Sequence, residues 1–301
     1  MRGKWLFIAV FLLPPLLLYG VFVVSPYAQA FQISATDWGG LSPEYEFIGL
    51  ANFRRLLADG YFWNALRHNA VLLVLLPVAT ILLGLFLASM ISVGGRPDRP
   101  GVHGVRGASV YRIVYFFPQV LSVAIIGVLW KEMYAPTGGL LNGVLRAVGL
   151  DALARPWLGD PRLAFWCVAL VLLWSNVGFY VVLFGAAMQA IPRDIYEAAL
   201  LDGASRLTTL VRVTVPLVWN TIQVAWVYLA ILAIDGFAVV QIVSDGGPGF
   251  SSDVVGLRLY KTAFTDSQFG YASAIGVTMF FLTLSVGVLF LRVTRRDRVE
   301  L

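Results

Sequence analysis

Four polar side chains stand inside strongly apolar stretches of this sequence, in pairs whose spacing puts each pair on one face of a helix. Asn176 and Tyr180 are four residues apart, and Tyr228 and Asp235 are seven apart. A polar group inside a membrane span is costly and often functional. The carboxylate of Asp235 could accept hydrogen bonds from adjacent hydroxyl groups of a ligand. A hydrogen bond between helices, or a position near the outer interface, explains the same residues equally well.

A second polar group interrupts the apolar pattern at residues 196–218, which read YEAALLDGASRLTTLVRVTVPLV. We expect a helix–turn–helix. Pro192 is suited to open the first helix, and Asp202-Gly203 breaks it because glycine adopts a left-handed conformation without steric cost. Ser205 can cap the second helix, which we expect to run to about residue 213 and to be ended by Pro216.

The first of these short helices carries Glu197 followed by two small side chains, Ala198 and Ala199. Adjacent small residues would let the surface of a partner protein approach closely. The alternative is an amphipathic helix lying on lipid, but the segment offers a small apolar face for stable interfacial binding.

Several other chemistries find no support in the sequence. Cys167 is the one cysteine, so an internal disulfide and a cysteine zinc site are excluded. The two histidines, His68 and His103, are far apart, and a structural role is the simpler interpretation of each. The sequence has no GxxxxGK[ST] motif, so we expect no ATP binding by a P-loop in this chain.

The composition is that of an integral membrane protein. The chain is 59% hydrophobic and 13% charged, with a mean hydropathy of +0.79, whereas soluble domains carry about 25% charge. A helical span needs about 20 apolar residues. We therefore expect one all-α membrane domain over residues 1–301, with a polar loop at 188–216. Its six expected spans are residues 5–24, 70–93, 113–130, 164–187, 217–240 and 272–291.

Basic residues set the expected orientation. If the N-terminus is cytoplasmic, the cytoplasmic segments hold 13 of the 22 Lys and Arg residues although the opposite loops are longer in total. Both termini and the loop 188–216 are then cytoplasmic. The net charge of +5 is thus explained by the membrane, and no nucleic-acid partner is implied. The first apolar run is longer than the core of a signal peptide, so we expect it to remain as a span.

The polar loop carries a resemblance to a known family. Glu197-Ala198-Ala199, Gly203 six residues after Glu197 and Pro216 nineteen after it resemble the EAA signature of permease subunits of binding-protein-dependent ABC importers. The segment AIPRDIYEAALLDGAS is similar to the carbohydrate-importer branch. So are FIGLANFRRLL, YFWNALRHNA, GGLLNGVL, WLGDP, DGGPGFSSDVVGLRLYKTAF and GYASAIGV, in the same order. Val213, Val215 and Ala238 depart from the usual pattern.

The resemblance implies a type I ABC importer permease with six transmembrane helices. It also implies a coupling helix that docks on a cytoplasmic ATPase dimer, which would bind ATP and Mg²⁺, so this chain itself needs no cofactor. The other implied partners are membrane lipid, a second homologous permease and an extracytoplasmic solute-binding protein. The implied coupling residues are Glu197, Ala198, Ala199, Asp202 and Gly203.

The same resemblance places substrate contacts on the fourth and fifth spans. By position these include Ser175, Asn176 and Phe179, then Ala233 and Gly236; the polar pairs described above lie beside them. The candidate substrate path is therefore Ser175, Asn176, Phe179, Tyr180, Tyr228, Asp235 and Gly236. The branch implies a di- or oligosaccharide, or a sugar or glycerol phosphate, as the substrate.

A turn-rich loop, SDGGPGFSSD at residues 244–253, follows the fifth span. Its Gly246-Gly247-Pro248 resembles the "first" permease of maltose-type and glycerol-phosphate-type importers. A tight chain reversal is the simplest interpretation. The further hypothesis is a contact of Gly246, Gly247, Pro248 and Ser251 with the docked binding protein.

An ion-coupled secondary transporter and a membrane-embedded enzyme are the alternatives to a permease subunit. An ion-coupled secondary transporter would favour inverted repeats and several acidic residues within spans. The sequence shows no evident repeat and one clear acid within a span. A membrane-embedded enzyme would need a cluster of His, Asp or Glu near one membrane face, and none is found. We therefore expect a non-enzymatic transport subunit in the cytoplasmic membrane of a bacterium or archaeon.

Overall fold

The computed structural model of the protein describes residues 2–92 and 107–293. Within these ranges the regular elements are helices joined by turns and loops, and an isolated β-bridge pairs Thr36 with Phe47. Among the described residues, four helices are long and apolar enough to cross a membrane, or up to six if each of two bent helix pairs counts as one span. His103, residue 93 of the second expected span, and the basic residues within 94–106 and 294–301 lie outside the described residues.

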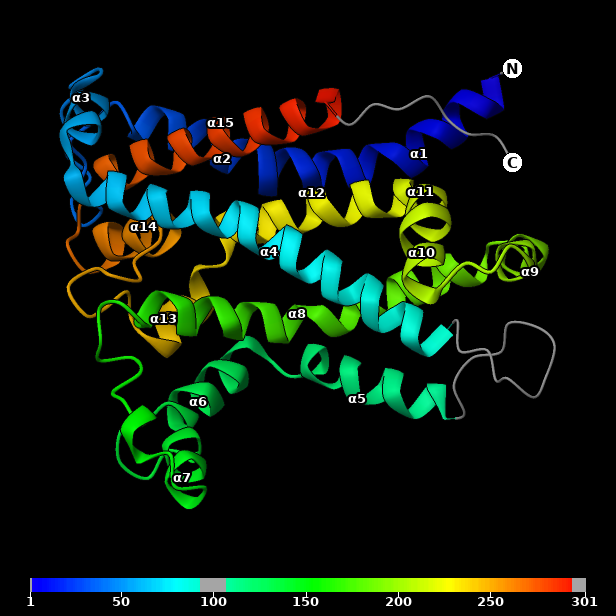
Figure 1. Ribbon diagram of the computed structural model, residues 1–301. Coiled ribbons are helices and arrows are strands. Elements are labelled where there is room, and N and C mark those ends of the chain that lie inside the picture. Colours follow the sequence, from blue (N-terminus) through cyan, green and yellow to red (C-terminus); the bar gives the residue numbers. More distant parts are fainter. Residues whose placement is uncertain (1, 93–106, 294–301) are drawn as a thin grey trace. The chain divides into compact units, whose positions relative to one another are not determined.

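Figure 1 labels the helices, which group into two compact units. The first contains Met1–Trp63 and Arg258–Ser285, and the second contains Asn64–Leu257 and Val286–Leu301. The single domain expected over 1–301 stays a prediction. In chain order the elements are α1 (Arg2–Tyr19), the π-helical turn η1 (Gly20–Val24), α2 (Ser25–Ile33), α3 (Ala51–Ala58), α4 (Gly60–Ser92), α5 (Ala108–Val120), α6 (Val123–Met133), α7 (Leu140–Ala147), the 3₁₀ turn η2 (Asp151–Leu153), α8 (Ala164–Gln189), α9 (Arg193–Leu201), α10 (Arg206–Thr209), the π-helical turn η3 (Leu210–Thr214), α11 (Val215–Leu217), α12 (Trp219–Asp235), α13 (Phe237–Val243), α14 (Val255–Phe264) and α15 (Phe269–Val293).

The core of the second unit forms where α4, α8 and α12 meet. α8 is apolar on all sides, which is typical of a helix surrounded by protein or lipid, and more than half of its most apolar window is buried. Side chains from α9 and η3 join the same core at one end. The core residues are Ile81, Leu85, Ala88, Ile91, Tyr180, Val181, Phe184, Met188, Ile191, Tyr196, Leu210, Val218, Ile222, Ala225 and Leu229.

Glycines allow close helix contacts around α8. A Cβ at Gly178 would collide with the backbone carbonyl of Tyr115 on α5, and a Cβ at Gly127 on α6 would lie 2.6 Å from Ile242 on α13. The α5–α8 and α6–α13 contacts therefore depend on the absence of side chains at these two positions.

The third expected span, 113–130, is not one straight helix. It consists of α5 and α6, which meet at an angle of 97° after a break at residues 121–122. Ser122 is extended and its hydroxyl accepts a hydrogen bond from the N–H of Ile125 (3.4 Å), so it caps the new helix. Hydropathy could not locate this break because both halves are apolar.

The fifth expected span, 217–240, is broken twice. The segment 206–217 meets α12 at an angle of 79° around Val218, and α12 itself ends at Asp235, before α13 begins. The expectation that Pro216 ends the preceding helix was wrong. Pro216 lies inside α11, and the N–H of Val215 reaches back five residues to Leu210. This wider π turn gives the proline ring the space that a regular turn lacks.

The first unit contains a second π turn that precedes a proline. The apolar helix over Val10–Ile33 is continuous past the expected end at residue 24. Ser25 donates its N–H to Gly20, again five residues back and again directly before a proline, Pro26. The C-terminal half of this helix packs on α15 by aromatic contacts, with ring centroids 5.4 Å apart for Tyr27 and Phe280.

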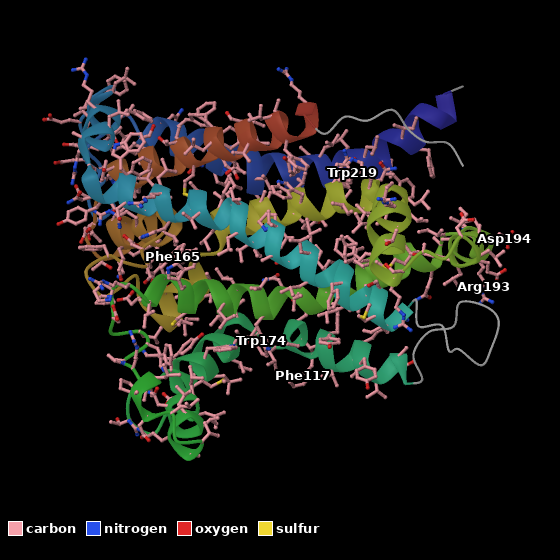
Figure 2. The ribbon with its side chains drawn as sticks, in the orientation of Figure 1. Phe117, Phe165, Trp174, Arg193, Asp194 and Trp219 are labelled. Atoms are coloured by element: carbon pink, nitrogen blue, oxygen red, sulfur yellow. The ribbon has the colours of Figure 1, made fainter. Side chains whose placement is uncertain are left out.

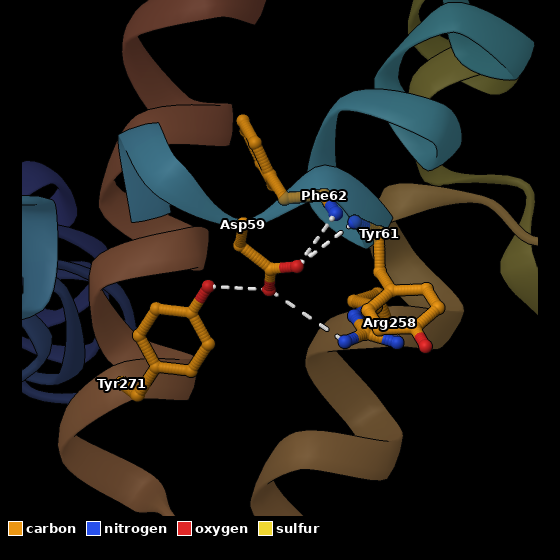
Figure 3. Close-up of polar contacts among 5 residues, drawn as sticks. All are labelled: Asp59, Tyr61, Phe62, Arg258 and Tyr271. Carbon is orange, nitrogen blue, oxygen red and sulfur yellow. Dashed lines mark hydrogen bonds and ion pairs between the residues drawn. The ribbon is translucent and has the colours of Figure 1, made fainter. Parts of the chain in front are cut away.

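The start of α4 is fixed by Asp59, whose carboxylate joins three elements of the first unit (Figure 3). One oxygen accepts the N–H groups of Tyr61 (2.9 Å) and Phe62 (3.3 Å), which caps the helix. The other oxygen accepts the Tyr271 hydroxyl of α15 (2.7 Å) and pairs with Arg258 of α14 (3.6 Å). The guanidinium of Arg258 also lies 4.7 Å above the ring of Tyr61.

These contacts change the acidity of Asp59. Burial alone would raise its pKa, but the bond from Tyr271, the N–H groups of Tyr61 and Phe62 and the charge of Arg258 together hold the pKa below its usual range. A lowered folded-state pKa stabilises the protein above the unfolded pKa of about 3.9. The contribution is lost as the pH falls through the lower folded-state value.

We predict that Asp59→Ala lowers the thermal unfolding midpoint of the protein in detergent, because it removes a helix cap worth about 1 kcal/mol and the bonds to α14 and α15. Asp59→Asn should be milder, because the amide oxygen still accepts the two N–H groups. Asp160→Ala is the matched control, since the carboxylate of Asp160 accepts one exposed N–H among the described residues, that of Arg162. Equal midpoints for Asp59→Ala and Asp160→Ala at pH 7 would show that the contacts of Asp59 do not stabilise the fold.

Candidate functional site

The polar loop expected to be a helix–turn–helix has that structure. α9 ends in a paired turn in which Gly203 donates to Leu200 (3.0 Å) and Ala204 donates to Ala199 (3.0 Å). Gly203 adopts a φ of +73°, which is strained for any residue with a side chain. The turn after Asp202 is therefore confirmed. Ser205 also caps the next helix as predicted, by accepting the N–H of Thr208 (3.2 Å).

Tyr196 anchors α9 to the membrane-spanning core. Its side chain is buried in the core of the second unit, and its hydroxyl accepts a hydrogen bond from Thr214 (3.4 Å) at the end of η3. Burial raises the pKa of Tyr196, and the bond to Thr214 offsets part of that change. The phenol is thus neutral at every physiological pH, and α9 is tied to the element that leads into α12.

The other face of α9 is exposed. Figure 1 shows the helix beyond the end of α8, and Figure 2 shows Arg193 and Asp194 at its start. Of the residues predicted to contact the ATPase, Glu197, Ala198, Asp202 and Gly203 are exposed. Leu201 beside them is 88% exposed. The expectation of two exposed alanines is corrected, because Ala199 is buried. Consecutive residues on a helix point about 100° apart. Of the two alanines, Ala198 therefore lies on the exposed face of α9 with Glu197.

The candidate path residues of α8 are divided between the core and the surface. Ser175 is buried and donates to the carbonyl of Leu172 (3.0 Å), while Asn176 donates to the same carbonyl (2.8 Å). Tyr180 points into the core, whereas Phe179 is exposed. The structure therefore does not bring Asn176 and Tyr180 to a common open surface.

The candidate residues of α12 lie on its exposed side. Tyr228 is 69% exposed, and Asp235 is exposed as the last residue of the helix. Asp235 therefore marks a helix break, where the sequence predicted a position inside a continuous span. Gly236 forms the break, and a Cβ there would lie 3.8 Å from Leu172. The break thus faces the turn of α8 whose carbonyl Ser175 and Asn176 bind.

Asn69 of α4 holds this break together, and sequence reasoning missed it. Its amide donates to the carbonyls of Ala233 (2.8 Å) and Ile234 (3.3 Å), which lose helical partners when α12 ends. Its oxygen accepts the N–H of Val255 (2.8 Å) at the start of α14. One side chain, 4% exposed, therefore satisfies the ends of two helices.

Two neighbours of Asn69 hold the loop that follows α13. Nδ1 of His68 lies 2.7 Å from the carbonyl of Asp253, so that nitrogen must carry the proton, and Asn64 donates to the carbonyl of Phe250 (2.8 Å). The imidazole also stacks on Phe165 at 4.8 Å. The structural role expected for His68 is confirmed. Among the described residues, no group of three His, Cys, Asp or Glu side chains could hold a metal ion.

The loop 244–253 is a compact reversal, as its simplest interpretation required. The hydroxyls of Ser244 and Ser252 lie 2.8 Å apart, and Ser252 also donates to the carbonyl of Gly247 (2.9 Å). Ser251 does not suit the expected contact with a partner, because its hydroxyl is buried. Gly246 is also buried, and the exposed tip of the loop is formed by Gly249 and Phe250.

A local signal for these anchoring residues existed. Asn64, His68 and Asn69 all lie in YFWNALRHNA, one of the segments that carry the family resemblance. Asn64 and His68 are four residues apart and share one face of a helix, whereas Asn69 points about 100° away from His68. The partners, however, are backbone groups more than 160 residues away, and nothing in a single sequence identifies those.

Comparison with known proteins decides the family. The sequence profile described as "Binding-protein-dependent transport system inner membrane component" matches residues 64–299. The chain belongs to this family. The resemblance drawn from the polar loop is thereby confirmed, and so is the expected class of all-α membrane permease.

Its relatives include permeases named for sugar uptake. The chain is 43% identical over 291 residues to the diacetylchitobiose uptake system permease protein NgcF of Streptomyces coelicolor, covering 96% of this chain and 82% of the relative. It is 31% identical to the multiple sugar-binding transport system permease protein MsmF of Streptococcus mutans, covering 96% and 95%.

A solved structure shares the fold. A chain of a bacterial ABC transporter involved in the import of the acidic polysaccharide alginate superimposes with a TM-score of 0.82, covering 98% of this chain and 96% of that one. The sequences are 22% identical, so this likeness concerns the architecture.

We predict that Asn69→Leu severely destabilises the protein, because it leaves three buried backbone groups without partners at about 1–3 kcal/mol each. Asn64→Leu is the matched control on the same helix, since it removes a single bond in a less buried place. Thermal unfolding in detergent should show a much larger fall for Asn69→Leu. A midpoint equal to that of Asn64→Leu would show that the break does not depend on Asn69.

Proposed function

We propose that this chain is the permease subunit of an importer that takes up a di- or oligosaccharide delivered by an extracytoplasmic binding protein. The observation that carries the proposal is α9, a short helix with an exposed face, held at its other face by Tyr196 in the core of the spans. Such a helix can transmit movement, because pushing its exposed face must displace the core residues it packs against.

The proposed partner on that face is a cytoplasmic ATPase dimer, which binds ATP and Mg²⁺ in place of this chain. Glu197, Asp202 and Arg193 give the face charge, while Ala198 and Leu201 offer apolar surface. A rim of charge around a small apolar centre is the composition of many protein interfaces. The paired turn at Gly203 fixes the end of α9, so little conformational entropy is lost on docking.

A second homologous permease is the proposed partner in the membrane. None of the most apolar window of Val10–Ile33 is buried, whereas 56% of the corresponding window of Ala164–Gln189 is. The exposed face of the first span carries Leu13, Leu16, Leu17 and Phe22. Membrane lipid and the second permease together would cover this surface.

The proposed substrate class rests on the relatives and on the path residues. The similar permeases are named for diacetylchitobiose and for multiple sugars. The break at Gly236 leaves Asp235 exposed, and its carboxylate would accept hydroxyl groups of a sugar. Asn176, Phe179 and Tyr228 stay candidate contacts beside it. We further propose that the tip of the loop 244–253, at Phe250, contacts the binding protein, since Ser251 is turned inward.

We predict that Glu197→Lys uncouples transport, because reversing the charge opposes docking of the ATPase. Binding-protein-stimulated ATP hydrolysis by the reconstituted importer should fall at least about tenfold, a loss typical of an interface hot spot. Gly203→Pro should act similarly, since proline cannot adopt a φ of +73°. Both variants should reach the membrane in normal amounts.

Glu132→Lys is the matched control for this prediction. It makes the same charge reversal at an exposed glutamate at the end of α6, away from α9. Its ATP hydrolysis should stay within about twofold of the wild type, the size of effect expected away from an interface. If Glu197→Lys and Glu132→Lys behave alike, α9 is not the docking helix.

We also predict that both termini are cytoplasmic, because basic residues are denser on that side. A reporter fused after Leu150 should be active only outside the cytoplasm, and one fused after Leu301 only inside. Paired alkaline phosphatase and fluorescent-protein fusions measure this directly. Reports from the same side at both positions would overturn the orientation.

A further inference from the structure

A cavity of about 230 Å³ lies at the C-terminal end of α2, within the first unit. It is bounded on one side by the helix and on the other by the segment that the Thr36–Phe47 bridge closes into a loop. Neither the coupling helix nor the candidate substrate path uses it. Its lining residues are Gln29, Gln32, Ile33, Thr36, Trp38 and Tyr45.

The helix contributes two amide side chains to this cavity. Gln29 and Gln32 are three residues apart and so lie on one face of α2. The Nε2 of Gln29 donates to the hydroxyl of Ser25 (3.1 Å), which leaves its oxygen able to accept. Within residues 2–92 and 107–293, no hydrogen bond engages the amide of Gln32. An amide offers both donors and an acceptor, which matches a ligand with adjacent hydroxyl groups.

The loop contributes aromatic surface that is already held in place. The indole N–H of Trp38 donates to the carbonyl of Ser42 (2.7 Å), and the ring packs on Phe269 with centroids 5.5 Å apart. Trp38 therefore presents ring carbons to the cavity and loses little freedom when a ligand binds. Tyr45 adds a second ring with a hydroxyl group. Apolar ring faces beside hydrogen-bonding groups suit the two kinds of surface of a sugar ring.

The charge around the cavity restricts the ligand. The lining side chains are uncharged. The surrounding segment 34–50 holds Asp37, Glu44 and Glu46 and has no Lys or Arg. Three carboxylates in a segment without a basic residue would disfavour a phosphate or a uronic acid. The size fits a single ring, since cavities that enclose drug-sized ligands measure about 300–1,000 Å³.

We propose that this cavity is an accessory binding site for one neutral sugar ring, positioned on the side from which substrate reaches the membrane. The position on that side rests on the proposed orientation and function of the chain. Gln29 and Gln32 bind ring hydroxyls, and Trp38 packs against the C–H face of the ring. The site would retain a sugar released by the binding protein without using any residue of α8 or α12.

Saturation-transfer NMR on the complete importer in nanodiscs, without the binding protein, tests the proposal. The probes are glucose and N-acetylglucosamine as neutral sugars and glucuronate as an acidic one. We expect the neutral sugars to bind and Gln32→Leu to weaken them about tenfold, because one or two hydrogen bonds are lost. Trp38→Leu should weaken them as well, and glucuronate should give no signal.

Gln189→Leu is the matched control, because it makes the same change at an exposed glutamine at the end of α8. The proposal is overturned if neutral sugars give no signal, if Gln32→Leu binds them as Gln189→Leu does, or if glucuronate binds equally well. Sugar uptake by the same preparations with the binding protein added separates the two ideas. If the wild type takes up sugar but its saturation-transfer signal does not depend on Gln32, the cavity proposal is rejected and the proposed function stands. If the wild type takes up no sugar, the proposed function is rejected.

Discussion

The constraint on which this structure depends is that backbone groups freed inside a membrane must be bonded within the protein. No water is available there, so each unpaired N–H or carbonyl costs several kcal/mol. The chain nevertheless breaks its fifth span at Gly236. It can do so because Asn69 binds the carbonyls of Ala233 and Ile234 and the N–H of Val255. The π turns before Pro26 and Pro216 meet the same constraint locally, by shifting a hydrogen bond back by one residue.

The break at Gly236 and the polar loop lie at opposite ends of one run of helices, which bends by 79° around Val218. Tyr196 bonds Thr214, and the chain continues from there through α11 into α12, which ends at Asp235. Closely packed side chains of α4 and α8 surround this route, and such a core resists compression. If α9 couples as proposed, its displacement would be passed along α12 toward the break. Asn69 would pass the same movement to α4 and to the start of α14.

Local chemistry was predictable from the sequence, and long-range pairing was not. The turn at Gly203 and the cap at Ser205 follow from residue types that act within a few positions of themselves. The burial of Ala199 could not be foreseen, because it depends on which side of α9 meets the core. The break at Gly236 was missed for a related reason. An apolar sequence supports a continuous span there, and the interruption is stable only because Asn69, 164 residues earlier, supplies the missing bonds.

The fold leaves the charge of the substrate open. The transporter for the acidic polysaccharide alginate has the same architecture at 22% identity. A permease that handles an anion needs cations or N–H groups along its route, because a carboxylate is costly to desolvate. In this chain α8 has no charged residue, α12 has only Asp235, and the segment around the proposed sugar cavity has acids alone. Each of these features opposes an anion. A neutral sugar binds through hydroxyl groups, which the amides of Gln32 and Asn176 and the carboxylate of Asp235 would bind in the proposed sites. Selection by charge would thus depend on these side chains, since a transporter of an acidic polysaccharide shares the fold.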